Sequence, residues 1–261
     1  VAFKFKGLKR WIKYSQLLLP YLYVLQKVDH LIIGELSKKK RYDFLASSKP
    51  KTIIGYYPVV EYFNYKKSDL IKEEIVLGYA GVITFERGIK NLLNVCKSIA
   101  EKYSKRKIKL LLFGKFTYQK EESEFKQIIS TINNLDVELV DWTDYNKMSS
   151  VIERMDICFD LRIRNFIYSN SLPIKLFEYM ACGKPFIYSD IKPIRDEIDY
   201  EKYGLVINPD NESEIINAIE SYLNNPKLAD EHSINARKLI EENKNWETES
   251  KKLIELVGKL L

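Results

Sequence analysis

From Ile75 onward, short apolar segments alternate regularly with amphipathic ones, and this alternation constrains the fold more than any other feature. The apolar segments contain few polar positions, which is typical of strands buried on both faces. The amphipathic segments repeat apolar residues at helical spacing. We therefore predict an α/β fold with a doubly wound parallel sheet between two layers of helices. The predicted strands are residues 75–80, 108–113, 137–140, 156–159, 185–188 and 204–207, and the predicted helices are 87–103, 120–133, 144–154, 173–182, 193–198, 212–224, one that begins at Pro226, and 245–260.

In a sheet of this type, ligands bind beyond the carboxyl ends of the strands, where the strand order reverses. The residues that directly follow the predicted strands are therefore the first candidates for a functional site. These segments are residues 81–88, 114–118, 141–144, 160–173 and 189–195.

The charge of the chain is unevenly distributed. Of the 261 residues, 46% are hydrophobic and 30% charged, which excludes a disordered or low-complexity chain. Residues 1–51 contain 12 Lys or Arg and three acidic residues, whereas the remainder contains 30 Lys or Arg and 33 acidic residues. Basic and aromatic side chains are neighbours in this first segment, as in Lys9-Arg10-Trp11, and such a mixture suits an anionic membrane surface. The alternative is a solvated helix face.

Other classes of protein are disfavoured by how their characteristic residues are spaced. The cysteines are far apart, which argues against disulfides and zinc, and favours burial in a reducing compartment; they are Cys96, Cys158 and Cys182. Neither His30 nor His232 has a neighbouring nucleophile or second His, which disfavours a His-based hydrolase. The apolar run from Leu17 to Leu25 is too short to cross a bilayer. No base-reading module accompanies the basic run at 38–41, so we expect no nucleic-acid partner.

The loop after the first of these strands has features of an anion site. Gly81 follows the strand, and Arg87 precedes the next helix. Glycine lets backbone N–H groups approach a ligand, a helix N-terminus favours an anion, and Arg87 can contact a phosphate through two N–H groups. The spacing matches neither G-x-G-x-x-G nor a P-loop, which disfavours dinucleotide-binding proteins and P-loop NTPases. A tight turn with a surface Arg explains the segment equally well.

The segment 170–185 predicts the start of a helix with Lys175 and Glu178 on one face. Pro173 suits the first helical turn. A Lys in that turn opposes the helix dipole, which is sensible if an anion docks there. The alternative is a surface ion pair, worth only ~0.3–0.5 kcal/mol. From chemistry alone, the two interpretations are equally good.

This segment also carries a family resemblance. Residues 171–185, with the sequence S-L-P-I-K-L-F-E-Y-M-A-C-G-K-P, closely resemble the donor-site helix of the retaining GT-B glycosyltransferases of family 4 (glycosyl transferases group 1). Other segments agree in order and spacing, namely residues 78–88, 110–114, 156–159, 203–210, 236–238 and 245–247. The resemblance covers residues 75–261 strongly and residues 1–60 loosely. It implies a Rossmann-like donor-binding domain and part of a second Rossmann-like domain.

The resemblance implies transfer of a sugar, with retention, from a nucleotide-sugar donor to a glycan or lipid-linked acceptor, without a metal ion or cofactor. It places Glu178 at the donor's ribose, Arg87 at the diphosphate, and Lys175 beside the phosphates or the donor sugar; these are the implied catalytic residues. The residues implied to line the donor site are Gly81, Thr84, Gly114, Lys115, Trp142, Asn170, Ser171, Leu172, Pro173 and Ile174.

Two positions depart from the family's pattern. Asn170 stands where the first Glu of the E-x7-E motif would be, eight residues before Glu178. Val82 stands where an Arg commonly follows the glycine of the phosphate loop. These departures favour one alternative, a non-catalytic nucleotide-sugar-binding or scaffold protein. A nucleotide-sugar epimerase is less favoured, because the carboxylates and His residues that it needs have no recognisable counterparts here.

The resemblance also implies a domain organisation. Residues 1–70 would form the C-terminal part of the acceptor-side domain, residues 71–244 the donor-binding domain, and residues 245–261 a helix that packs back towards the first domain. The first half of the family's N-terminal domain has no counterpart in the sequence, so we expect that this chain does not catalyse transfer unaided. We expect it to be cytoplasmic and peripheral on the inner face of the membrane.

Overall fold

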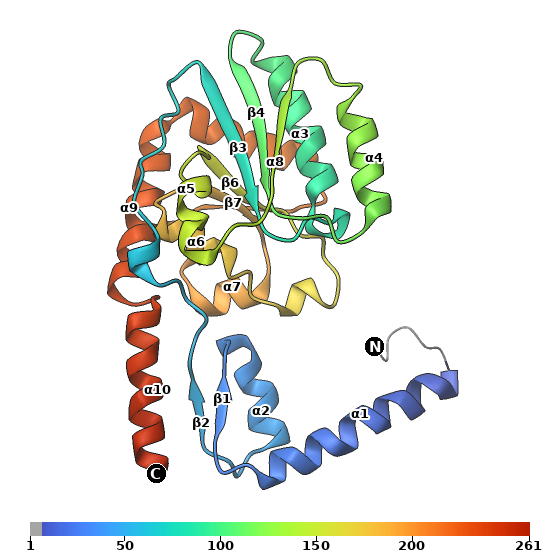
Figure 1. Cartoon of the computed structure of the whole chain (residues 1–261), viewed down its shortest axis with the longest axis vertical. Helices are drawn as coiled ribbons and strands as arrows, with labels where there is room; N and C mark the ends of the chain where they lie inside the picture. Colours follow the sequence, from blue (N-terminus) through green and yellow to red (C-terminus); the bar gives the residue numbers. More distant parts are fainter. Residues whose placement is uncertain (1–6) are drawn as a thin grey trace. The chain divides into compact units, whose positions relative to one another are not determined.

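The apolar segments form the strands of a parallel sheet, as the alternation predicts. The computed structural model describes residues 7–261, and the chain divides into two compact units, Val1–Gly55 and Tyr56–Leu261. In the second unit, a six-stranded sheet has the order β5-β4-β3-β6-β7-β8, with every neighbouring pair parallel (Figure 1). Its strands are β3 (Glu74–Ala80), β4 (Lys107–Phe113), β5 (Asp136–Val140), β6 (Ile157–Asp160), β7 (Phe186–Ser189) and β8 (Leu205–Ile207).

The strand order reverses beside β3, in the middle of the sheet. Leu77 of β3 is in register with Leu110 of β4 on one side and with Ile157 of β6 on the other. The chain runs outward from β3 through β4 to β5, and then returns to the other side of β3 to form β6. The junction of β3 and β6 is therefore the switch point at whose carboxyl end ligands bind in sheets of this kind.

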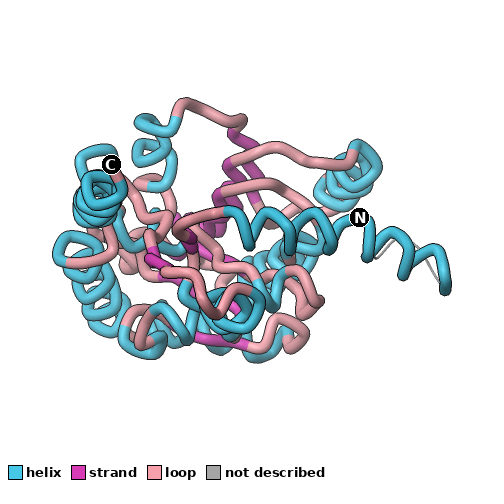
Figure 2. The backbone as a smooth tube through the Cα atoms, turned by 90° about the horizontal axis from the view of Figure 1, so that it is seen from below, coloured by secondary structure: helices cyan, strands magenta, loops and turns pink. Residues whose placement is uncertain are grey.

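Helices cover both faces of this sheet (Figure 2). The strand side chains alternate between two hydrophobic cores. Leu77 and Tyr79 belong to one core, and Val76 and Ala80 to the other, because successive side chains of a strand point to opposite faces. The helices are α3 (Ile89–Lys102), α4 (Gln119–Ile129) and α8 (Glu212–Asn224) over the first core, and α5 (Met148–Ile152), α6 (Lys175–Ala181), α7 (Lys192–Glu197) and α9 (Pro226–Glu242) mainly over the second. The predicted doubly wound α/β fold is confirmed.

Local hydrogen bonds fix where the helices begin and end. Asn211, Asn225 and Asn245 cap α8, α9 and α10 (Trp246–Leu260), each accepting a backbone N–H from the first turn. The prediction that a helix continues to residue 133 is wrong, because α4 ends at Ile129. The hydroxyls of Ser130 and Thr131 donate to carbonyls of the last turn, and such side-chain bonds compete with continuation of a helix.

The first unit contains α1 (Gly7–Lys27), β1 (Leu31–Ile33), α2 (Lys39–Leu45) and β2 (Lys51–Ile53), and β1 pairs with β2 in parallel. Large apolar side chains of α1 are exposed, among them Leu8, Trp11 and Leu19. Within residues 7–261, no helix combines the length and the apolar character needed to cross a membrane. Residues 1–6 of the predicted membrane-facing segment lie outside the described residues.

The cysteines and histidines occupy structural positions. All three cysteines are free and buried, as predicted. His232 is buried, its Nδ1 lies 2.9 Å from the Tyr222 hydroxyl, and burial lowers its pKa. His30 is partly buried, with Nε2 2.9 Å from Thr52 Oγ1. Each histidine thus lies within hydrogen-bond distance of a hydroxyl group of its own unit.

Gly88, which precedes α3, provides a test of this packing. Its φ of +79° is a left-handed conformation, and a Cβ there would overlap the Leu161 carbonyl. We expect Gly88→Ala to lower the free energy of unfolding in urea by at least ~1–2 kcal/mol. Gly258→Ala is the matched control, because nothing lies within 4 Å of the added Cβ and the position is helical. That change should be neutral or raise stability by up to ~1 kcal/mol, and equal effects of the two substitutions would contradict the expectation.

Candidate functional site

The loops that follow β3 and β6 meet at the switch point. Residues 81–88 contain a short 3₁₀ turn at Phe85–Arg87, and residues 161–174 connect β6 to α6. The Ile163 N–H donates to the Glu86 carbonyl at 3.0 Å, which joins the two loops. Gly88 allows the same approach, because its missing side chain leaves room for the Leu161 backbone. The two loops therefore form one continuous wall at the carboxyl edge of the sheet.

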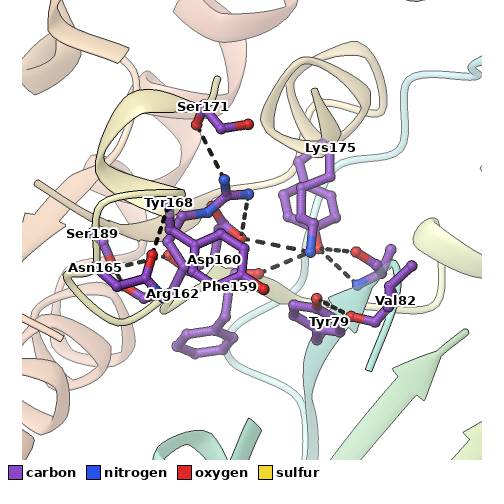
Figure 3. A network of polar contacts seen from close by, with 12 residues as sticks. Tyr79, Val82, Phe159, Asp160, Arg162, Asn165, Tyr168, Ser171, Lys175 and Ser189 are labelled. Atoms are coloured by element: carbon purple, nitrogen blue, oxygen red, sulfur yellow. Dashed lines mark hydrogen bonds and ion pairs between the residues drawn. The ribbon is translucent and has the colours of Figure 1, made fainter. Parts of the chain in front are cut away.

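A buried ion pair lies at the end of β6 (Figure 3). Asp160, the last residue of this strand, is fully buried, and Arg162 is nearly so. The Arg162 guanidinium donates to Asp160 through Nε at 2.8 Å and Nη2 at 3.3 Å, and through Nη1 to the Ser171 carbonyl at 3.2 Å. Burial alone would raise the pKa of Asp160, but Arg162 and Lys175 outweigh it and hold the pKa below its usual value. The carboxylate is therefore charged.

Lys175 begins α6, and its side chain is only 7% exposed. Its Nζ lies 3.5 Å from Asp160 Oδ1 and 3.6 Å from the centroid of the Tyr79 ring. Among the described residues, this ammonium group has no hydrogen-bond partner. Burial lowers the pKa of Lys175 to about 7, and the charge of Asp160 limits this decrease. Lys175 is thus a buried cation with unused donors.

Arg87 and Arg162 both lie close to the ring of Tyr168. The Arg87 guanidinium is 5.7 Å from the centroid of this ring, and that of Arg162 is 5.6 Å from the same centroid. These separations allow cation–π attraction. Tyr168 thereby links the loop after β3 to the loop after β6, and Arg87, Arg162 and Lys175 gather around one carboxylate.

Glu178 lies in the turn of α6 that follows Lys175, and it is buried as well. Burial raises its pKa to about 7, and Lys175 opposes this shift. The surface ion pair considered from the sequence is therefore wrong, because both Lys175 and Glu178 are inside the protein.

The predicted glycines lie close together at the ends of β3 and β4. A Cβ on Gly114 would overlap the Gly81 carbonyl, and a Cβ on Gly81 would lie 2.8 Å from Lys175 Nζ. Gly114 and Lys115 line a cavity of about 410 Å³, and Lys115 pairs with Asp141 at 3.3 Å. Trp142 is partly exposed and packs edge-on against the Phe113 ring. Gly81 therefore lies beside Lys175, whereas Gly114 and Trp142 follow β4 and β5, on the far side of β3 from Asp160.

The remaining predicted residues divide into two groups. Thr84 is buried before the 3₁₀ turn, and its hydroxyl has no hydrogen-bond partner among the described residues. Ser171, Leu172 and Pro173 precede α6, and Ile174 is its N-cap. The amide of Asn170 is engaged within its own loop, because its Nδ2 donates to the Phe166 carbonyl at 2.8 Å.

The sequence interpretation missed Asp160, Arg162 and Tyr168, which complete the cluster. One signal for the first two exists in the sequence: an acid and a base, two residues apart, end an apolar strand at an edge where ligands bind. The position of Tyr168 close to two guanidinium groups has no local signal, because it depends on how the two loops meet.

The raised pKa of Glu178 predicts a stabilising substitution. The folded state favours its protonated form, so a penalty on folding is absent below pH 4.5, grows as pH rises towards 7, and is complete above that value. A pKa raised from 4.5 to about 7 corresponds to about 3 kcal/mol. We expect Glu178→Gln to raise the free energy of unfolding in urea by up to this amount at pH 8 and to have little effect at pH 4.5.

Glu138→Gln is the control for this substitution. Its carboxylate is bound by Arg154 and Lys109, which lower its pKa to about 2, so the charged form stabilises the fold. Its replacement should not stabilise the protein at pH 8. A Glu178→Gln variant that is no more stable than the parent at pH 8 would contradict the assignment of a desolvated carboxyl group.

Comparison with solved structures identifies the fold. Sucrose-phosphate synthase from Thermosynechococcus elongatus superposes with a TM-score of 0.74 at 20% identity, over 93% of this chain and 61% of that one. HepE from Anabaena in complex with UDP has a TM-score of 0.71 at 14% identity, over 89% and 64%. A variant of S. aureus TarM in complex with fondaparinux, α-GlcNAc-glycerol and UDP has a TM-score of 0.71 at 17% identity, over 90% and 45%. The fold is therefore that of the GT-B Rossmann-like glycosyltransferases, and the chain spans less than two thirds of these structures.

Sequence comparison gives the family. A search among curated proteins found no significant match. Residues 61–239, which are more than half of the chain and include the whole cluster around Asp160, match the family described as "Glycosyl transferases group 1". The chain belongs to the glycosyl transferases group 1 family.

Proposed function

We propose that this chain supplies the donor-binding half of a retaining glycosyltransferase of family 4, which transfers a sugar from a nucleotide-sugar to an acceptor. One observation carries the proposal: Arg87, Arg162 and Lys175 gather around a single carboxylate at the switch point of the sheet. Their N–H groups are donors that the oxygens of a diphosphate would accept. HepE and TarM structures contain UDP, and a further HepE structure contains UDP-glucose, which supports a nucleotide-sugar as the ligand.

The geometry supports a division of labour among the site residues. Lys175 has unused N–H donors beside Gly81, where a phosphate oxygen could accept them. Arg87 reaches the same wall from the loop after β3, where its planar guanidinium suits bidentate binding of phosphate. As the bond between sugar and diphosphate breaks, negative charge grows on the leaving oxygen. Cations held in a site of low dielectric stabilise that charge, and we propose that these residues act in place of a metal ion or cofactor.

Glu178 and the glycines would orient the nucleoside. A buried carboxylate is a strong acceptor for the two ribose hydroxyls, and their binding would compensate its desolvation. The cavity beside Gly114 and Lys115 has room for a base. Trp142 packs against Phe113, the residue before Gly114.

The acceptor side of the reaction involves the first unit. Because the chain spans 61% to 64% of two of the similar structures, we propose that acceptor binding requires protein beyond these residues. A glycan or lipid-linked acceptor agrees with the fondaparinux and α-GlcNAc-glycerol bound to TarM. The exposed apolar and basic side chains of α1 support association with an anionic membrane surface from the cytoplasm.

A non-catalytic nucleotide-sugar-binding protein is the second candidate. Asn170 replaces the first Glu of the E-x7-E motif, and its amide is engaged within its own loop. The two candidates differ in turnover. Release of nucleoside diphosphate from a nucleotide-sugar in the presence of an acceptor would establish the enzyme, whereas tight binding without any release would favour the binding protein.

Binding of UDP, GDP and ADP, measured by isothermal titration calorimetry, tests the donor site. We expect one of them to bind and Arg87→Ala to weaken that binding by roughly 10- to 100-fold, because a charge-assisted phosphate contact is lost. Arg154→Ala is the matched control, since this guanidinium binds Glu138 and lies away from the carboxyl ends of the strands. Equal affinities of the Arg87→Ala variant and the parent would remove Arg87 from the site.

Co-sedimentation with vesicles tests the membrane proposal. We expect binding to vesicles that contain phosphatidylglycerol, and a decrease of at least about tenfold for Lys9→Glu/Lys13→Glu, because each Lys near an anionic surface contributes about 1 kcal/mol. Lys251→Glu/Lys259→Glu on α10 is the control of equal charge change. Sedimentation that does not depend on anionic lipid would refute the proposal.

A further inference from the structure

Asp160 touches two of the three cations of the candidate site at once. Arg162 Nε lies 2.8 Å from Oδ2 of this carboxylate, and Lys175 Nζ lies 3.5 Å from Oδ1. The carboxylate is fully buried at the end of β6, so solvent does not screen these interactions. Asp160 lies outside the segments that resemble the donor-site motifs.

We propose that Asp160 is a positioning residue of the donor site: it keeps the Lys175 side chain in its ammonium form and aims the unused N–H donors at the diphosphate of the donor. The inference rests on the proposed function, because it assumes a nucleoside diphosphate at this edge of the sheet. Asp160 does not itself touch the ligand in this arrangement; it acts through Lys175 and Arg162.

The first step concerns the charge of Lys175. The groups that face it are Asp160 of β6, Arg162 and Arg87 of the two loops, Glu178 of its own helix, and Tyr79 of β3. Burial and the two guanidinium groups favour the neutral amine, whereas Asp160 and, more weakly, Glu178 favour the ammonium ion. Asp160 is therefore the main group that keeps this nitrogen protonated before the ligand arrives.

The second step concerns direction. The Tyr79 ring supports the ammonium group from one side, with its centroid 3.6 Å from Nζ, and Tyr79 is itself held by a 2.7 Å bond to the Val82 carbonyl. Asp160 attracts it at 3.5 Å without a hydrogen bond. Gly81 leaves the neighbouring space open, since even a Cβ there would come within 2.8 Å of Nζ. The N–H donors are thus oriented but lack acceptors, and a ligand with anionic oxygens would supply them.

The third step concerns the segment that leads into α6. Arg162, held by Asp160, donates to the Ser171 carbonyl and so tethers the residues just before Lys175. Ser189 of β7 holds the backbone at the end of β6, because its hydroxyl donates to the carbonyls of Asp160 and Arg162. A single carboxylate therefore sets both the charge of Lys175 and the position of the backbone that carries it.

Replacement of this carboxylate by an amide gives the main test. Asp160→Asn retains the shape and can still accept a bond from Arg162, but it no longer favours the ammonium form of Lys175. We expect affinity for UDP, or for GDP or ADP if one of these binds more tightly, to fall at least about tenfold at pH 7.5. The difference from the parent should narrow as the pH is lowered, because more of the Lys175 side chains are then protonated without the carboxylate.

Two further variants separate positioning from simple damage to the fold. Asp156→Asn removes a buried carboxylate four residues earlier, one that binds Lys72 and the Val76 N–H at the other edge of the sheet, and it should leave the affinity unchanged. In a Lys175→Met background, adding Asp160→Asn should change the affinity less than about twofold, because the ammonium group is gone and the amide still accepts a bond from Arg162. An equal loss in both backgrounds would overturn the proposal.

A measurement on the unmodified chain covers the case in which Asp160→Asn does not fold. At pH 8.5 most of the Lys175 side chains are neutral and the diphosphate is fully ionised, so binding should be accompanied by uptake of about half to one proton. Calorimetry in two buffers of different ionisation enthalpy measures this uptake, and Lys175→Met should abolish it. Failure of UDP, GDP and ADP to bind the parent would refute the proposed function. Binding without proton uptake, or undiminished by Asp160→Asn, would refute only the role of Asp160.

Discussion

The negative charge of Asp160 makes the rest of the site possible. Arg162 and Lys175 are both buried, and an unpaired buried charge costs several kcal/mol. The carboxylate compensates part of this cost for both cations, but three positive charges surround it when Arg87 is included. The folded protein therefore gathers cationic side chains at a buried point, where solvent screens their charges less than it screens those of the exposed ion pairs.

The topology of the sheet brings these charges together. Because β3 and β6 are neighbours although far apart in sequence, the loops after them share one edge, and their backbones approach each other at Gly88 and Leu161. Gly114 permits a similar approach to Gly81 from β4. The buried charges of the site lower the stability of the fold, and the hydrophobic cores on both faces of the sheet compensate for this loss. Burial lowers the pKa of Lys175 and raises that of Glu178, both to about 7. Folding therefore favours the neutral form of each group.

Elements with a local signal were predictable from the sequence, whereas contacts between distant loops were not. The strands follow from apolar periodicity. The helix predicted from residue 87 begins at Ile89, because residues 85–87 form a separate 3₁₀ turn and Gly88 adopts a left-handed conformation. The end of α4 was missed because two hydroxyl groups turn back onto its last carbonyls. Lys175 and Glu178 were found as a motif, but the sequence did not distinguish a buried pair from a surface pair. Burial is set by packing of α6 against the sheet, which local spacing does not encode.

The departures from the family's pattern acquire a physical meaning in this setting. Val82 removes a cation from the loop after β3, yet its carbonyl holds the Tyr79 hydroxyl, and the ring of Tyr79 supports Lys175. Arg162 adds a cation from the opposite loop. The site thus keeps its positive charge while moving it from the loop after β3 towards β6 and α6. Asn170 has no such replacement, because no acidic side chain takes its place within the described loop of residues 161–174. The described residues at this edge of the sheet therefore keep their positive charge, whereas the acidic side chain that the motif has at position 170 is absent.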